Sequence, residues 1–228
     1  VGLWQVTRNK WYWPGLLFLL AIIFLSLSYG GWLALVGAIA LVMLKTPQRR
    51  PWFWLLVLGV GILVLSQWSS PKFSQLFNWS ARSTSLSRWE IWQTSVLILK
   101  DHPLAGIGLR QFPLIYPDYV SKIVFPPQEW APPQPHNLYL ALWLNMGLLG
   151  LLTFGLLVYL ALRQLPKSSW LWFSLPLVSI LWHGLVDTPY FKNDLSIIFW
   201  FFLALTLICS TSPKKSFQSQ TFLQRSEK

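Results

Sequence analysis

The chain has 228 residues, of which 54% are hydrophobic and only 11% are charged, and its formal net charge at pH 7 is +11. An ordinary soluble domain carries about 25% charged residues, so this composition argues against one. The single cysteine, Cys209, excludes an intrachain disulfide and a cysteine cluster that holds zinc or iron–sulfur. The positive charge would suit nucleic-acid binding, but its distribution along the chain points elsewhere, as shown below.

Long uncharged stretches dominate the sequence. One lies between Lys10 and Lys45 and another between Glu129 and Arg163. About 20 apolar residues cross a bilayer core, so runs of this length predict membrane helices. The first run is too long for one helix, and the phrase Ser28-Tyr29-Gly30-Gly31 in its middle predicts a turn between two helices.

The sequence therefore predicts an all-α, polytopic membrane protein of about six transmembrane helices with one large extracytoplasmic loop. In chain order we expect a cytoplasmic segment (1–10), three transmembrane helices (11–67), the loop (68–135), three further transmembrane helices (136–210) and a basic cytoplasmic tail (211–228). The last three helices are expected at about 137–162, 170–186 and 195–210. A cleavable signal sequence is not expected, because the first apolar block lacks a small-residue cleavage site.

The basic residues fix the expected orientation. With both termini in the cytoplasm, the inside segments carry a net charge of +10 and the outside segments +1. An excess of lysine and arginine in cytoplasmic loops is the usual signature of membrane orientation. The positive charge is thus an orientation signal, and no nucleic-acid partner is expected.

Within the outer loop, residues 87–100 show a helical pattern. Trp89, Trp92, Val96 and Leu99 recur at spacings of three and four. Ser87 followed by Glu90 three residues later predicts a capping box at the start of this helix. The pattern is typical of an amphipathic helix that lies on the outer membrane face or over the helix bundle.

Several short phrases follow one another in and after the loop. Arg88-Trp89-Glu90-Ile91-Trp92 precedes Pro103-Leu104-Ala105-Gly106-Ile107-Gly108, in which the glycines are expected to supply positive φ angles. His136-Asn137-Leu138-Tyr139-Leu140 and Gly147-Leu148-Leu149-Gly150 come later. The order of these phrases resembles the shared membrane domain of O-antigen ligases and polymerases, over roughly residues 20–205. The chain departs from that pattern at Tyr29, where relatives commonly have arginine, and at Asn145, where an acid is common.

The resemblance implies transfer of a glycan from an undecaprenyl-diphosphate carrier to an acceptor sugar at the outer face of the bacterial cytoplasmic membrane. Its partners would be the lipid-linked glycan, an acceptor glycan or glycolipid, and membrane lipids. An arginine matches phosphate oxygens and can stabilise a leaving diphosphate without a metal or cofactor. We therefore take Arg88 and His136 as candidate catalytic residues, His136 as the base that activates the acceptor hydroxyl. The candidate substrate-binding residues are Arg110, Arg82, Asn137 and Trp92.

Structural readings of the same residues remain open. Arg88 could instead contact a lipid headgroup, and His136 could form a hydrogen bond to a loop carbonyl. His183 and Asp187, four residues apart, are either a polar site or a helix-end hydrogen bond. Two other functions are also open: a transporter of a small anion such as bicarbonate, and a truncated, non-catalytic relative.

Overall fold

The computed structural model describes residues 28–45, 83–165, 170–191 and 193–211, together with positions 18, 22, 25, 61, 65, 68 and 69. Its regular structure within these residues is entirely helical, as predicted. In chain order the helices are α3 (Tyr29–Lys45), α6 (Thr84–Asp101), α7 (Phe112–Val120), α8 (Leu138–Gln164), α9 (Trp170–His183), the 3-10 turn η2 (Pro189–Phe191) and α10 (Asn193–Thr211). The terminal segments lie outside the described residues, and so does most of the region expected to form the first three transmembrane helices (11–67), apart from residues 28–45.

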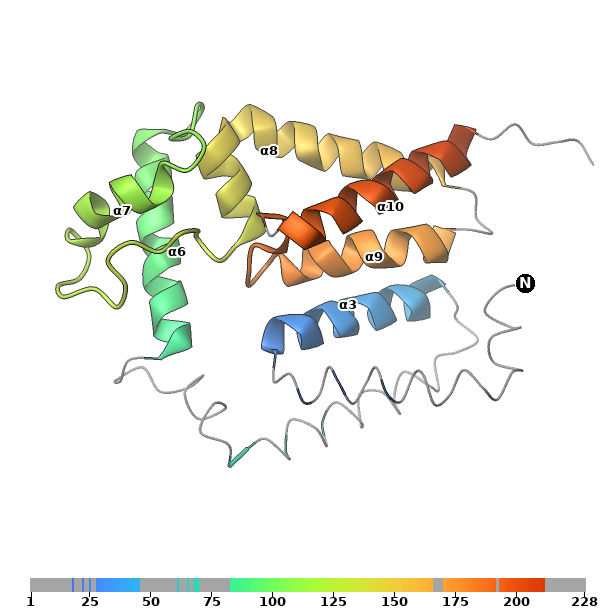
Figure 1. Ribbon diagram of the computed structural model, residues 1–228, viewed down its shortest axis with the longest axis horizontal. Coiled ribbons are helices and arrows are strands. Elements are labelled where there is room, and N and C mark those ends of the chain that lie inside the picture. Colours follow the sequence, from blue (N-terminus) through green and yellow to red (C-terminus); the bar gives the residue numbers. More distant parts are fainter. Residues whose placement is uncertain are drawn as a thin grey trace, which may run out of the picture.

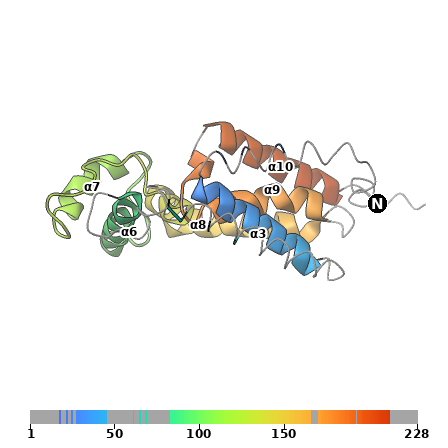
Figure 2. The same cartoon turned by 90° about the horizontal axis from the view of Figure 1, so that it is seen from below.

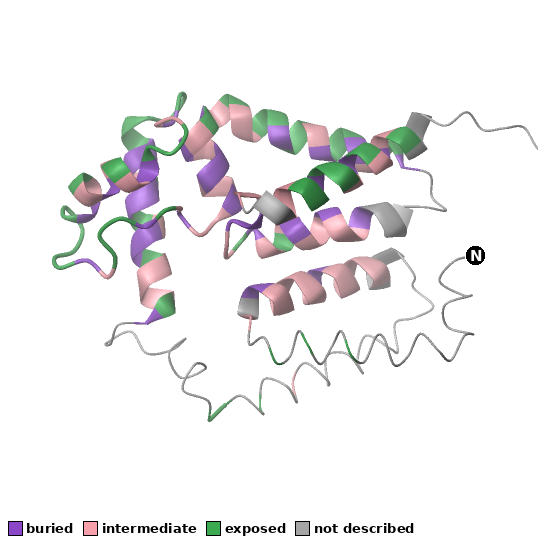
Figure 3. Cartoon of the chain, in the orientation of Figure 1, coloured by how far each residue is buried: buried purple, intermediate pink, exposed green. Residues whose placement is uncertain are grey.

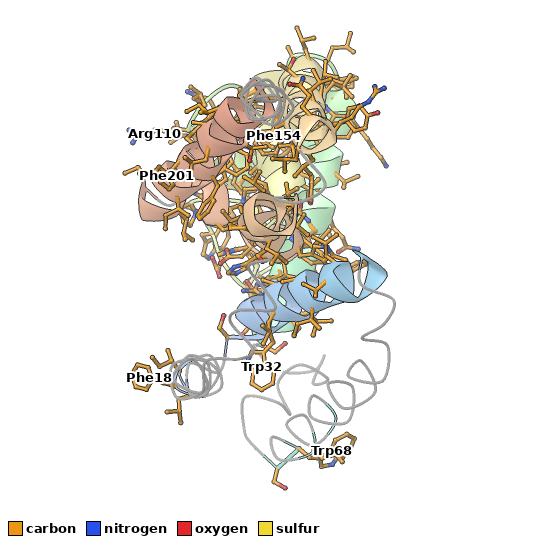
Figure 4. The ribbon with its side chains drawn as sticks, turned by 90° about the vertical axis from the view of Figure 1, so that its right-hand side faces the viewer. Phe18, Trp32, Trp68, Arg110, Phe154 and Phe201 are labelled. Atoms are coloured by element: carbon orange, nitrogen blue, oxygen red, sulfur yellow. The ribbon has the colours of Figure 1, made fainter. Side chains whose placement is uncertain are left out.

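A bundle of parallel-lying helices forms one part of the molecule. Helices α3, α9 and α10 and residues 148–164 of α8 run side by side along one axis (Figures 1 and 2). Their buried side chains are apolar, and within them Phe154 stacks on Phe199 with ring centroids 5.3 Å apart. Figure 4 shows Phe154 inside this bundle and Phe201 on its outer side.

The exterior of the bundle is also apolar. Figure 3 shows exposed residues along the outer sides of α8 and α10, and they include Leu149, Leu152, Leu156, Ile197 and Phe201. Large exposed apolar surfaces are unusual on soluble monomers and suit contact with lipid. In the described part of the chain one helix, Leu138–Gln164, is long and apolar enough to cross a membrane, and shorter apolar helices accompany it.

Helix α6 lies across one end of the bundle, nearly at right angles to it (Figure 1). Helix α6 corresponds to the helix expected at 87–100, but the predicted N-cap at Ser87 is wrong. Ser83 is the N-cap, and its hydroxyl oxygen accepts a hydrogen bond from the Leu86 N–H. Ser87 instead donates to Glu129 across the loop, at 3.0 Å. A short-range motif therefore identified the helix but misplaced its start by one turn.

Helix α8 is broken at Gly147, whose φ of 71° and ψ of 180° are not helical. Residues 138–146 run alongside α6, whereas residues 148–164 run along the bundle (Figure 1). The described residues form two clusters of buried apolar side chains, and residues 138–146 contribute to both. Leu138 and Leu142 belong to the core of the bundle, while Leu144 belongs to a second core formed with α6 and α7.

The loop that contains Gly106 and Gly108 fills the break in α8. The Leu148 N–H donates to the Leu104 carbonyl at 2.9 Å, and the Ile107 N–H donates to the Leu144 carbonyl at 2.7 Å. These bonds satisfy the two backbone groups that an unbroken helix would pair with each other. The positive φ angles expected at Gly106 and Gly108 are confirmed, at 65° and 90°.

Candidate functional site

His136 lies in the loop directly before α8, in the left-handed backbone region, with φ of 48°. The next residue holds that turn in place. The Asn137 side-chain oxygen caps α8 by accepting from the N–H groups of Tyr139 and Leu140, each at 3.0 Å. Its amide nitrogen donates to the Leu185 carbonyl at 2.9 Å. Both ends of the Asn137 amide are thus engaged by the protein, which ties His136 to the turn after α9.

That turn brings Asp187 against His136. The Nδ1 atom of His136 lies 3.2 Å from Asp187 Oδ1, and the Thr188 N–H donates to the same oxygen at 2.8 Å. His183, at the end of α9, places its Nε2 atom 3.9 Å from Asp187 Oδ2. The two histidines and the aspartate therefore form one cluster, with side chains 31%, 23% and 17% exposed for His136, His183 and Asp187.

The aspartate determines what His136 can do. An ionised carboxylate only accepts hydrogen bonds, so Nδ1 of His136 carries the proton of the shared bond. The lone pair then lies on Nε2, which is the atom available to take a proton from a substrate hydroxyl. The carboxylate also stabilises the imidazolium that forms when the proton is transferred. The cluster is partly exposed, and it contains a histidine whose ring is oriented by a carboxylate, which is the arrangement that a general base requires.

Helix α6 contacts the backbone of His136. The indole N–H of Trp92 donates to the His136 carbonyl at 3.3 Å. Arg88 lies one helical turn earlier on α6, so it shares a face with Trp92. The Arg88 side chain is half-buried, and within the described residues it makes no hydrogen bond or ion pair. Trp92 therefore brings the candidate base and the candidate phosphate-binding arginine into one region.

The other two candidate arginines have different surroundings. Arg110 is exposed and projects from the surface (Figure 4), and its backbone N–H donates to the Asn145 side-chain oxygen at 3.2 Å. The described contacts connect Arg110 to the break in α8 rather than to His136. Arg82 lies outside the described residues, immediately before the cap of α6.

The first turn of α3 packs against the histidine cluster. Ser28 caps this helix, accepting from the Gly31 N–H at 3.2 Å. A Cβ atom added at Gly30 would lie 2.6 Å from His183 Nε2, so a larger residue here would displace the His183 ring. The turn predicted at residues 28–31 is thus the start of α3, and its backbone lies beside His183. The partial positive charge of a helix N-terminus favours anions there.

A buried carboxyl group fixes the loop that leads to His136. Glu90 of α6 is only 5% exposed, and it accepts from the Gln128 backbone N–H at 3.0 Å and from the Tyr116 hydroxyl at 3.4 Å. Together with the Ser87–Glu129 hydrogen bond, these contacts attach the loop at residues 128–129 to the side of α6. Glu90, predicted as part of a capping box, instead anchors the segment that presents His136.

Glu90→Gln is expected to remove a pH dependence of folding stability. Burial raises the pKa of the Glu90 carboxyl above its ordinary 4.5, although hydrogen bonds from Gln128 and Tyr116 oppose that shift. Since the folded-state pKa lies above the unfolded one, the stabilisation is complete below about pH 4.5 and is lost as pH rises through the folded-state pKa. Glutamine keeps the acceptor for Gln128 without the charge.

The measurement is the thermal unfolding midpoint between pH 4.5 and 8, starting at the ordinary pKa of Glu90. The wild-type midpoint should fall with rising pH relative to that of Glu90→Gln. Asp118→Asn, at an exposed position of α7, is the matched control and should follow the wild type. Parallel curves for wild type and Glu90→Gln would contradict the expectation.

Sequence reasoning missed the pairing of Asp187 with His136. The sequence did show that His183 and Asp187 are four residues apart, and they do lie close together. It gave no signal that both would meet His136, because Asp187 is 51 residues away along the chain. That contact depends on the packing of the α8 start against the turn after α9.

The comparison with known families agrees with the motifs. The family model described as O-antigen ligase matches residues 14–155, more than half of the chain. Arg88 and His136 lie inside the match, whereas His183 and Asp187 lie beyond it. Neither the curated proteins nor the solved structures contain a significant match. The resemblance is confirmed: the chain belongs to the O-antigen ligase family, whose members are membrane-associated, glycosyltransferase-like ligases and polymerases.

Proposed function

We propose that this protein transfers a glycan from an undecaprenyl-diphosphate carrier to an acceptor sugar at the outer face of the bacterial cytoplasmic membrane. The observation that carries the proposal is the 3.2 Å contact between His136 Nδ1 and Asp187 Oδ1, which orients a histidine beside the arginine-bearing helix α6. General-base activation of a hydroxyl and stabilisation of a phosphate leaving group are the two demands of this reaction.

In the proposed step the acceptor hydroxyl gives its proton to His136 Nε2 as its oxygen attacks the anomeric carbon of the donor sugar. The bond from that carbon to the diphosphate oxygen breaks, and the electron pair leaves with the undecaprenyl diphosphate. Asp187 stabilises the imidazolium formed on His136. Arg88 pairs with the negative charge that grows on the diphosphate, as a guanidinium fork matches phosphate oxygens. No metal is required by this scheme.

The membrane arrangement is part of the proposal. Six transmembrane helices with both termini in the cytoplasm would put the 68–135 loop and His136 outside. The apolar exterior of α8 and α10 supports burial of the bundle in lipid, and the net charges of +10 and +1 support the orientation. Helix α6, lying across the end of the bundle, would then run parallel to the membrane surface (Figure 1).

Arg88→Ala is expected to lower the rate of transfer from a polyprenyl-diphosphate-linked oligosaccharide by about 10²–10³-fold, the usual effect of removing one group that stabilises developing charge. Arg88→Lys should recover part of the rate, because lysine keeps the charge and loses the fork. Lys122→Ala removes an exposed cation that lies over the Tyr119 ring, and it serves as the control.

The assay uses purified full-length protein in lipid nanodiscs, with EDTA present throughout. Transfer that persists in EDTA and in Lys122→Ala, but collapses in Arg88→Ala, is the expected result. Transfer abolished by EDTA and restored by a divalent cation would contradict the metal-free scheme. Equal rates for Arg88→Ala and wild type would remove Arg88 from the proposed site.

A further inference from the structure

A groove of about 450 Å³ runs along α6 on the side away from its buried face. It is lined by Trp89, Trp92, Gln93, Val96, Leu97, Lys100 and Ile123. The buried face of α6 is formed by other residues, among them Ile91, Ile98 and Leu99. The lining is mostly apolar with two polar side chains, and its volume falls in the range of small-molecule sites. The groove is therefore separate from the packing of the core.

Trp92 joins this groove to the proposed reaction site. Its ring lines the groove, while its indole N–H donates to the His136 carbonyl. From Trp92 the groove extends to Lys100, eight residues along α6, or about 12 Å at 1.5 Å per residue. Trp89, at the near end, directly follows Arg88. A chain-like ligand that lies in the groove would therefore have one end at Trp92, which contacts the His136 backbone and lies one helical turn from Arg88.

The position of α6 favours a ligand from water over a lipid tail. Residues 138–146 of α8 lie between α6 and the helices of the bundle in both views (Figures 1 and 2). If the bundle spans the bilayer, α6 lies one helix layer beyond its outer end. A hydrocarbon chain would have to leave the bilayer core to occupy the groove, whereas a sugar chain is already in water at that level.

We propose that this groove binds a saccharide chain that takes part in the transfer reaction. A pyranose ring presents an apolar C–H face, which suits the indole rings of Trp89 and Trp92, and a rim of hydroxyls. Gln93 offers a donor and an acceptor to such hydroxyls, and Lys100 offers donors and a positive charge that favours acidic sugars. The inference rests on the proposed function and names a subsite for it. Donor and acceptor glycans share this chemistry, and the experiment separates them.

Direct binding is measured on the full chain with His136→Ala, which prevents turnover, in nanodiscs with 5-fluorotryptophan. The probe is a tetrasaccharide pool cut from the source cell's own surface polysaccharide. The fluorine signals of Trp89 and Trp92 should shift saturably, and Trp89→Ala should raise the Kd about tenfold, the loss of one aromatic contact. Trp130→Ala, at an exposed tryptophan outside the groove, is the matched control and should leave the Kd unchanged.

Kinetics then identify the source of the saccharide. In the otherwise wild-type chain, Trp89→Ala and Gln93→Ala should raise KM about tenfold for one substrate and leave kcat nearly unchanged. A higher KM for the soluble acceptor assigns the groove to the acceptor glycan, and a higher KM for the lipid-linked donor assigns it to the donor glycan. Unchanged KM values for both substrates, with normal transfer, would overturn the inference and leave the proposed function intact.

Two further outcomes are distinct. Saccharide binding that depends on Trp89, in a wild-type protein that shows no transfer, would support the groove and contradict the proposed function. Broadening of the Trp89 signal by spin-labelled lipid, without any shift on adding saccharide, would show that the groove faces the bilayer and would overturn the inference.

Discussion

His136→Ala is expected to reduce glycan transfer by about 10²–10⁴-fold, the range for loss of a positioned general base. The reason is the geometry of the His136–Asp187 pair, in which the carboxylate 3.2 Å from Nδ1 leaves Nε2 unprotonated. Initial rates with donor and acceptor both saturating measure the effect on kcat. His102→Ala is the matched control, because His102 is exposed at the C-terminal cap of α6.

Asp187→Asn tests the same mechanism through the orientation of His136. The asparagine amide can donate to Nδ1, which would shift the imidazole proton to Nε2 and leave no base there. We expect a loss of about 10²-fold or more in kcat, with the acceptor KM nearly unchanged. If His136→Ala is as active as His102→Ala, the base lies elsewhere.

Gly147→Ala is expected to be the most destabilising single change in the described part of α8. At φ 71° and ψ 180° the backbone is in a region that only glycine tolerates. A Cβ atom there would lie 2.3 Å from the Leu104 carbonyl oxygen, which is backbone and cannot rotate away. We expect a loss of at least about 2 kcal/mol, from strain and from expulsion of the loop out of the break.

Gly155→Ala is the matched control for this prediction. Gly155 lies in the helical second segment of the same helix, and a Cβ atom there would meet nothing within 4 Å. Alanine at such a helical position is neutral or stabilising, by up to about 1 kcal/mol. Thermal midpoints in nanodiscs compare the two variants. Equal midpoints would show that the break in α8 does not depend on Gly147.

Gly106→Ala should resemble Gly147→Ala, because the two glycines lie on opposite sides of one contact. A Cβ atom at Gly106 would lie 2.4 Å from the Leu144 carbonyl oxygen. Since both substitutions expel the same loop, their combined effect should be smaller than the sum of the two. That comparison tests whether the loop and the break form one unit.

The sequence by itself determined the features that depend on local composition and spacing. Long apolar runs predicted the helices that are present as α8, α9 and α10, because an uncharged stretch of that length has few other stable conformations. The spacing of Trp89, Trp92, Val96 and Leu99 located α6 as a helix. It did not identify the packed face, because Trp89 and Val96 are exposed and only Leu99 of the four is buried. The order of the short motifs was also sufficient to recognise the family.

Tertiary structure alone decided how those motifs combine. Gly147, at the break in α8, and Gly106, in the loop that fills it, are about 40 residues apart in the sequence. A Cβ atom at Gly147 would first meet the Leu104 carbonyl oxygen, and one at Gly106 the Leu144 carbonyl oxygen. Asp187 reaches His136 only because Asn137 and the backbone of Leu138 bind the turn after α9. Contacts of this kind leave no periodic signal in one sequence, because they arise when separate helices pack and bury their free backbone groups. The orientation of His136, on which the proposed chemistry depends, is set by that packing.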